Sequence, residues 1–428
     1  GYMLYNETRN SFYGDSSIVK DSNHINTSIY QKFKVGFGVR QLKIIDLSNN
    51  SHQPLSDKNN THWIIFNGEI YNYKEIRNEL IGLGYSFFSN SDTEVILNAY
   101  KEWKEEALTK LNGMFAFAIF NKIDNSLFIA RDRIGIKPLF YHQNKQHFIF
   151  GSTIKSIISS SLYKPEINWK GLHQNFQFST AQSPTTCFQD VYSLEPGHYL
   201  KINVHTNSVD KKQYWDIPTN TQNFDFTEKK ALNLIEESLY SSIEKRLISD
   251  VEIGSFMSGG IDSTTISVIA SKFKKELKVL TLGFHDYEDL NEVPQAKDTA
   301  KLHGLNHHVS YTDATMAIKN LTDAVLAYEE PYFHLSANFM LAKMASDNQL
   351  KVVLSGLGGD ELFGGYDVYK KLPLWQKLKK GKSLINILPN VHQKLNKAKQ
   401  IANYSSIEEF YSHYYENYGT LQTHQLLN

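Results

Sequence analysis

The sequence predicts two domains of different fold class: an α+β domain with antiparallel sheets, followed by an α/β domain with a parallel sheet. In the first half, short apolar β-type runs are separated by turn signals. In the second half, strand-like and helix-like runs alternate. The 428 residues, 41% of them apolar, suffice for two or three cores. We place the domains at residues 1–217 and 226–428, joined by a polar linker at 218–225.

The first domain is predicted from β-type runs and two helical patterns. Its strand-like runs occupy residues 63–66, 115–120, 126–130, 138–141 and 147–151. The first run ends at Asn67-Gly68, a strong turn signal, and residues 121–125 join the next two runs as a hairpin. Residues 73–80 and 94–103 have helical spacing.

The second domain begins with apolar residues at helical spacing from Leu232 to Leu247. Four strand-like runs follow, at residues 252–257, 278–284, 307–311 and 351–354, each separated from the next by a helical segment. This alternation predicts a doubly wound parallel sheet that binds ligands at the carboxyl ends of its strands. After Tyr366 the chain is mostly helical.

A glycine-rich loop with the sequence Ser-Gly-Gly-Ile-Asp-Ser occupies residues 258–263. It follows a predicted strand and opens a helix, so its backbone N–H groups and its serines can bind an anion. Asp262 would repel a phosphate unless a Mg²⁺ ion lay between them. The loop lacks the Gly-Lys-Ser/Thr ending of a Walker A motif, which argues against ordinary γ-phosphoryl transfer.

A second loop of the same kind follows the strand at residues 351–354. Its sequence, Ser-Gly-Leu-Gly-Gly-Asp-Glu at residues 355–361, again combines glycines with a carboxylate at Asp360. Because the carboxyl ends of parallel strands meet at one edge of a sheet, we expect the two loops to form one site.

Composition excludes several classes of function. The chain has 45 basic and 45 acidic residues, which argues against a nucleic-acid or membrane-surface binder that relies on bulk charge. No apolar stretch approaches the length of a transmembrane helix, and the first residues do not form a signal peptide. One cysteine excludes a disulfide framework and predicts a cytoplasmic protein.

Six motifs, in this order, resemble those of the asparagine synthetase family, over essentially the whole chain. They lie at residues 67–72, 91–94, 130–135, 194–198, 258–263 and 358–366. The resemblance implies an N-terminal nucleophile (class II glutamine amidotransferase) sandwich, followed by an ATP pyrophosphatase-type (adenine nucleotide α-hydrolase-like) domain. It also implies that ammonia released from glutamine attacks an acyl-adenylate made from ATP and aspartate, with Mg²⁺ required and a homodimer as the assembly.

The resemblance assigns residues to an ATP site. The pyrophosphate part of ATP would be held by Ser258, Gly259, Gly260, Asp262 and Ser263. The adenosine would lie near Phe256, Leu282, Ser355 and Gly356. Asp262 and Asp360 would be the Mg²⁺ ligands.

It also assigns residues to a glutamine site. Asn67 and Gly68 match an oxyanion-hole pair, and Arg40 matches the arginine that binds the glutamine carboxylate. Glu69 and Asp92 match the acids that hold the α-ammonium group. Taken singly, each has a structural alternative: a hairpin turn, a surface ion pair or a helix cap. We interpret Arg131 and Asp132 as a structural pair.

Two departures from the family pattern affect the prediction. Position 1 is glycine, where the family's nucleophile is an N-terminal cysteine, and Cys187 is predicted to be a packed thiol. We therefore expect a chain truncated at both ends that does not hydrolyse glutamine. In addition, Leu357 replaces the glutamate that assists the attack of ammonia. Glu329, Glu330 and Glu361 are nearby acids that could compensate.

Three functions remain open at this stage. The first is asparagine synthesis from aspartate. The second is the same chemistry on another carboxylate, such as a sugar acid or a peptide precursor. The third is a non-catalytic homologue that senses nucleotide or partners another subunit, against which the paired carboxylates Asp262 and Asp360 argue.

Overall fold

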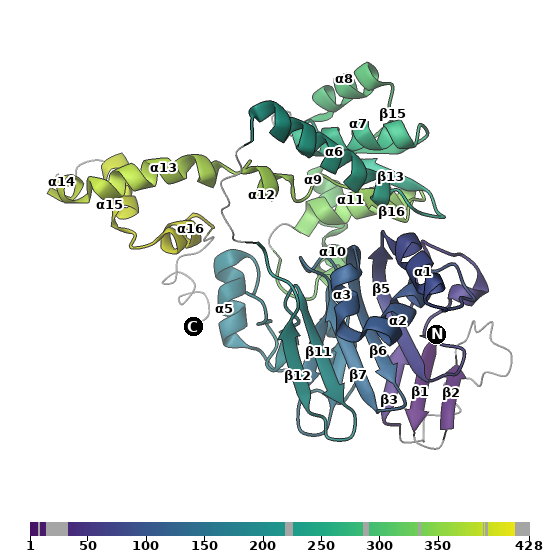
Figure 1. Cartoon of the computed structure of the whole chain (residues 1–428). Helices are drawn as coiled ribbons and strands as arrows, with labels where there is room; N and C mark the ends of the chain where they lie inside the picture. The colour runs from purple at the N-terminus through teal and green to yellow at the C-terminus, as the bar shows by residue number, and fades with distance from the viewer. Residues whose placement is uncertain are drawn as a thin grey trace. The chain divides into compact units, whose positions relative to one another are not determined.

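The computed structural model describes residues 1–6, 9–13, 33–218, 226–285, 291–332, 335–387, 389 and 393–415. The chain forms two compact units (Figure 1). The first unit comprises Gly1–Glu166 and Ser183–Ile253, and the second comprises Ile167–Gln182 and Gly254–Asn428. Most of the linker predicted at 218–225 lies outside the described residues, so the domain boundaries drawn from the sequence stay a prediction.

A six-stranded antiparallel sheet organises the first unit, as the α+β prediction requires. Its strand order is β12-β11-β7-β6-β5-β4. In that order the strands span Val209–Gln213, His198–Asn203, Ser126–Arg131, Gly113–Asn121, His62–Ile70 and Leu55–Ser56. The predicted hairpin is confirmed as β6 and β7, in register from Asn121 opposite Ser126.

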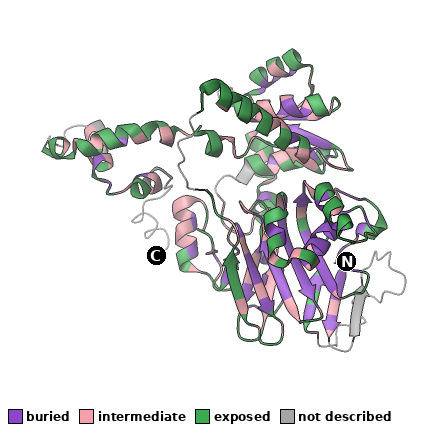
Figure 2. Ribbon diagram, in the orientation of Figure 1, coloured by how far each residue is buried: buried purple, intermediate pink, exposed green. Residues whose placement is uncertain are grey.

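Both faces of the central strands of this sheet are buried, as Figure 2 shows, whereas the edge strand β12 is mostly exposed. One core joins β5 and β6 to helices α1 (Tyr73–Gly82) and α2 (Asp92–Trp103) through Ile64, Leu80 and Leu97. The other core joins them to a three-stranded sheet of order β2-β1-β3 through Met3, Phe37 and Phe120. The result is a layered sandwich whose central strands alternate their side chains between two cores.

The remaining elements of the first unit complete its edges. The small sheets contain β1 (Tyr2–Asn6), β2 (Arg9–Tyr13), β3 (Val35–Gly38), β8 (Phe140–Gln143), β9 (Phe148–Gly151) and β10 (Val191–Ser193). The other helices are η2 (Asn49–Ser51), η3 (Lys104–Glu106), α3 (Ala107–Lys110), α4 (Ile154–Ile158) and α6 (Glu228–Arg246). Cys187 is buried, as predicted.

The turn predicted at Asn67-Gly68 is wrong. Strand β5 continues through both residues to Ile70, with Asn67 opposite Ala116 and Gly68 opposite Phe115 on β6. Gly68 has a φ of 154°, and a Cβ there would lie 2.0 Å from the carbonyl oxygen of Met114. The glycine therefore permits a close approach of two strands, and pairing with β6 overrides the local turn preference.

Arg131 and Asp132 are structural, as predicted, although each bonds to backbone rather than to the other. The guanidinium of Arg131 donates to the carbonyl oxygens of Gly135 and Lys137, both over 2.8 Å. The buried carboxylate of Asp132 accepts from the backbone N–H groups of Phe115, Ile136 and Lys137 over 2.9 to 3.1 Å. Together they fix the loop that follows β7.

The second unit contains the predicted parallel sheet. Its order is β15-β14-β13-β16, and the β13–β14 and β14–β15 pairs are parallel. In chain order the strands are β13 (Ile253–Phe256), β14 (Lys278–Phe284), β15 (Asn306–Thr312) and β16 (Val352–Leu354). The chain thus moves outward from β13 through β15 and then returns to the other side of β13. Such a reversal of strand order is where α/β sheets bind ligands.

The second unit also contains helices, of which α5 precedes these strands in the chain and the others connect or follow them. They are α5 (Trp169–Phe178), α7 (Ile261–Phe273), α8 (Val293–His303), α9 (Ala314–Lys319), α10 (Leu321–Ala327), α11 (Leu335–Asp347) and α12 (Gly359–Phe363). The predicted helical tail is confirmed as α13 (Asp367–Lys380), α14 (Lys382–Ile387), α15 (Gln393–Asn403) and α16 (Ile407–Tyr415). The tail has its own small core around Trp375, Tyr404 and Phe410. No helix in the described ranges has the length and apolar character that crossing a bilayer requires.

Replacing Asp132 with asparagine is expected to destabilise the first unit by about 1–3 kcal/mol, because an amide would direct its NH₂ group at backbone donors. A lower urea midpoint, followed by tryptophan fluorescence, would report the loss. Asp124→Asn is the matched control, since both bonds that Asp124 accepts fall on one oxygen, which the amide retains. Equal midpoints for the two variants would contradict the structural role of Asp132.

Candidate functional site

The loop at residues 258–263 joins β13 to α7 and is fixed by its own serines. Ser263 Oγ accepts from the backbone N–H of Ser258 over 3.0 Å and lies 2.9 Å from Ser258 Oγ. Ser258 Oγ in turn accepts from the N–H of Gly260 over 3.0 Å. The turn therefore presents backbone and hydroxyl donors at the first turn of a 13-residue helix, where the helix dipole favours an anion.

The second loop packs directly against the first. A Cβ on Gly356 would lie 2.7 Å from the backbone nitrogen of Ser263, and one on Gly359 would lie 2.3 Å from Oδ2 of Asp262. A side chain at position 356 would require a backbone shift, and one at position 359 would displace the Asp262 side chain. Asp262 therefore lies against Gly359, the residue that precedes Asp360. The two loops meet because β13 and β16 are neighbours in the sheet.

Asp360 and Leu357 occupy exposed positions of this second loop. A Cβ on Gly365 would lie against Oδ1 of Asp360, so the Asp360 carboxylate lies over the turn after α12. Leu357 is 89% exposed, immediately before the left-handed Gly358. Ser355 is exposed as well. The carboxylate of Glu361 accepts from the hydroxyl of Tyr366 over 2.7 Å, and this bond lowers the pKa of Glu361.

Two of the four residues expected near adenosine share one apolar cluster. Phe256 on β13 and Leu282 on β14 pack against one core cluster, which includes Leu280 and Met344. Both are only partly buried. They form an apolar surface in the same unit as the two loops.

Two further features of this site are not apparent from the sequence. Glu292, just before α8, accepts a hydrogen bond from the N–H of Gly259 over 3.3 Å. Thr281 donates its hydroxyl proton to the carbonyl of Met257 over 2.6 Å and therefore accepts from Nε2 of His307 at 2.7 Å. Burial lowers the pKa of His307, with a smaller contribution from His308. This bonded chain holds the residue before Ser258 to the middle of the sheet.

Within the part of the chain that the structure describes, no three His, Cys, Asp or Glu side chains gather as the ligands of one metal ion would. Asp262 and Asp360 are a pair of carboxylates from adjacent loops. Mg²⁺ is usually held by one or two carboxylates together with substrate phosphates and water. The two side chains therefore fit a Mg²⁺ ion that arrives with a nucleotide, rather than a closed metal site.

In the first unit, β5 carries three of the residues assigned to glutamine. Asn67 is exposed and donates through Nδ2 to Ser152 Oγ over 3.5 Å, and Gly68 follows it in the strand. Arg40 lies two residues beyond the end of β3 and is exposed. Its guanidinium forms no ion pair with the residues that the structure describes.

Glu69 and Asp92 are both buried, which the sequence did not predict. Burial raises the pKa of Glu69 to about 7, opposed by the charge of Lys137. Burial also raises the pKa of Asp92 to about 7, and the negative charge of Glu69 raises it further. The backbone N–H of Ile70, which donates to Asp92 over 3.1 Å, opposes this rise. Two adjacent buried acids make this position one where a cationic group would be stabilised.

The same burial predicts a pH dependence of stability. Because their pKa values are raised in the folded state, the protonated acids contribute fully to the free energy of unfolding below their unfolded-state pKa of about 4. This contribution is lost as the pH rises through about 7. We expect Glu69→Gln to raise the melting temperature relative to the parent at about pH 8 and to have little effect at about pH 5. The exposed Glu75→Gln serves as the control. A Glu69→Gln effect of the same size at both pH values would refute this account.

Two family models match successive parts of the chain. A glutamine amidotransferase domain model matches residues 21–215, and an asparagine synthase model matches residues 234–425. Among solved structures, glutamine phosphoribosylpyrophosphate amidotransferase from Bacillus subtilis aligns with a TM-score of 0.31 and 13% identity, over 75% of each chain. At that score the alignment does not establish a shared fold, and the family models support the assignment.

Curated relatives share more sequence. Asparagine synthetase [glutamine-hydrolyzing] 1 of Bacillus subtilis is 40% identical over 339 residues, which are 79% of this chain and 52% of that protein. Amidase chry2 of Gibberella zeae is 30% identical over 78% of this chain and 52% of its own length. The chain therefore spans about half the length of several relatives.

A third relative is covered more fully. The putative asparagine synthetase [glutamine-hydrolyzing] 2 of Methanocaldococcus jannaschii is 31% identical over 373 residues, which are 80% of this chain and 71% of that protein. The two family models, the ordered motifs and this coverage agree: the chain belongs to the glutamine-hydrolysing asparagine synthetase family.

Proposed function

We propose that this chain belongs to an amidotransferase that converts a carboxylate to an amide through an acyl-adenylate. In this proposal the chain binds glutamine and activates the carboxylate with ATP. The observation that supports this proposal most is the adjacency of β13 and β16, which sets two glycine-rich, Asp-bearing loops against each other. A protein that only senses nucleotide needs no second carboxylate at the phosphates. Two carboxylates are useful where pyrophosphate leaves.

In the nucleotide half, the first loop binds the phosphates that leave. The N–H groups of Gly259 and Gly260 and the hydroxyls of Ser258 and Ser263 are the proposed phosphate donors. The bond from Gly259 to Glu292 is exchanged for one to phosphate when ATP binds. Asp262 and Asp360 would hold Mg²⁺, which neutralises the charge that develops on pyrophosphate. Phe256, Leu282, Ser355 and Gly356 would surround the adenosine.

In the glutamine half, we propose separate roles for residues on and near β5. Arg40 binds the α-carboxylate, since a guanidinium suits a bidentate carboxylate. Glu69 and Asp92 bind the α-ammonium group, whose charge their buried carboxylates would stabilise. Asn67 and Gly68 donate to the oxyanion of the tetrahedral intermediate. Cys187 is buried, so we assign it no role as the nucleophile that the family resemblance calls for.

The acceptor distinguishes two candidate functions. The names of the relatives favour aspartate and hence asparagine synthesis. One observation favours another carboxylate: Leu357 is exposed at the loop beside Asp262, where it can neither take a proton from ammonia nor orient it. ATP, glutamine and the acceptor are then the substrates. A cytoplasmic location, suggested by the single cysteine, and a homodimer remain predictions.

Pyrophosphate release tests the proposal and identifies the acceptor. With ATP, Mg²⁺ and ammonium chloride, we expect release to depend on addition of one carboxylic acid from a panel of aspartate, sugar acids and amino-acid derivatives. Asp262→Asn is expected to lower the rate at least about 100-fold, because it removes a charge needed at the leaving group. The exposed Asp298→Asn on α8 is the control.

Two results would count against the proposal. Unchanged turnover in Asp262→Asn would contradict the metal role of this side chain. Release that no acid stimulates would contradict carboxylate activation and favour the non-catalytic alternative.

A further inference from the structure

A pocket of about 290 Å³ lies in the first unit, away from the residues assigned to glutamine. None of those residues lines the pocket, which extends along α2 from Glu94 to Lys101. Its walls come from the turn after β4, the segment after α1 and one face of α2. The residues that matter here are Asp57, Lys58, Tyr85, Glu94, Asn98 and Lys101.

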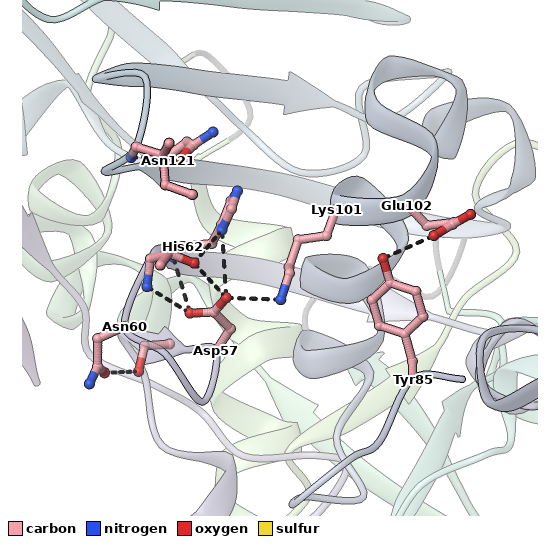
Figure 3. A network of polar contacts seen from close by, with 10 residues as sticks. Asp57, Asn60, His62, Tyr85, Lys101, Glu102 and Asn121 are labelled. Atoms are coloured by element: carbon pink, nitrogen blue, oxygen red, sulfur yellow. Dashed lines mark hydrogen bonds and ion pairs between the residues drawn. The ribbon is translucent and has the colours of Figure 1, made fainter. Parts of the chain in front are cut away.

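The two carboxylates on the pocket wall are already saturated. Asp57 accepts from the N–H groups of Thr61 and His62 over 2.8 and 3.2 Å, from the Thr61 hydroxyl over 2.7 Å, and from Lys101 Nζ over 2.9 Å (Figure 3). Glu94 accepts from the N–H groups of Phe88 and Ser89 and from the Ser89 hydroxyl. A ligand that mainly donates hydrogen bonds, such as an amine, therefore finds no free acceptor on these acids.

Donors, by contrast, are in excess. Lys101 directs one of its three N–H groups to Asp57, and Lys58 directs one to Ser86 Oγ over 2.8 Å. Asn98 is only 5% exposed, yet its amide makes no hydrogen bond with any residue of the described ranges. Its amide atoms are not among the buried polar atoms without a partner, so they remain accessible from the pocket and can donate to a ligand there.

Charge and shape narrow the ligand further. The charges of Lys58 and Lys101 balance those of Asp57 and Glu94, so the pocket does not favour a dianion such as phosphate. The hydroxyl of Tyr85 donates to Glu102 over 3.0 Å, as Figure 3 shows, which leaves its ring as an apolar wall beside Leu83 and Leu97. These features suit one carboxylate group attached to a short aliphatic body.

We propose that this pocket is a binding site for a small aliphatic monocarboxylate, whose oxygens accept from Lys101, Lys58 and Asn98. Its apolar body contacts Leu83, Leu97 and the ring of Tyr85. None of these residues belongs to the proposed glutamine or ATP sites, so the pocket is a separate, non-substrate site.

Calorimetric titration with isovalerate tests the proposal, with isovaleramide and isoamylamine as neutral and cationic analogues of the same shape. We expect saturable binding of isovalerate at millimolar concentration and at least about tenfold weaker binding of both analogues, because each loses a charge-assisted bond. No saturation by about 10 mM, or equal binding of the amide, would overturn the proposal.

Variants locate the binding within the molecule. Asn98→Leu keeps the volume and leaves the Lys101–Asp57 pair intact, so it is the decisive change, and it is expected to weaken isovalerate binding at least about fivefold. Lys101→Met is expected to weaken it more, and circular dichroism checks its fold because Asp57 loses a partner. Lys74→Met, exposed on α1, is the matched control. Unchanged affinity in Asn98→Leu, or an equal loss in Lys74→Met, would overturn the assignment.

Discussion

The proposed nucleotide site depends on one constraint, the position of β13 beside β16 in the parallel sheet. These two strands are far apart in sequence but adjacent in the sheet, and a glycine-rich loop follows the carboxyl end of each. The loops can pack only because Gly356 and Gly359 lack a Cβ where Ser263 and Asp262 approach. Hydrogen bonds from His307 to Thr281 and from Thr281 to Met257 fix the residue that precedes the first loop. Strand order therefore decides which side chains meet.

The first unit depends on a comparable close approach, between β5 and β6 at Gly68. Because β5 continues as a strand, Asn67 and Glu69 belong to a paired strand rather than to a turn. Glu69 and Asp92 are both buried in the first unit, and this burial raises the pKa of both. A site that stabilises a cation thus arises from the layers of the sandwich, at a cost in stability at neutral pH and above.

Periodic patterns and glycine motifs were enough to predict both fold classes, and the strands of the parallel sheet were predicted to within two residues. Local preference failed at Asn67-Gly68, where pairing with β6 outweighs the turn signal. The pairing of β1 with β3 depends on contacts distant in sequence that no local pattern encodes. Site residues were assigned by resemblance, whereas the burial of Glu69 and of Asn98 depends on tertiary packing and is visible only in the folded structure.

The most direct test of the central claim, that the two loops act as one Mg²⁺–ATP site, is a double-mutant cycle on ATP binding in the presence of Mg²⁺. It compares the parent with Asp262→Asn, Asp360→Asn and the double variant. If both carboxylates bind one ion, each single change removes most of the Mg²⁺-dependent affinity and the double variant loses little more, with a coupling of about 1–3 kcal/mol. Strictly additive losses, or ATP affinity that does not depend on Mg²⁺, would contradict the account.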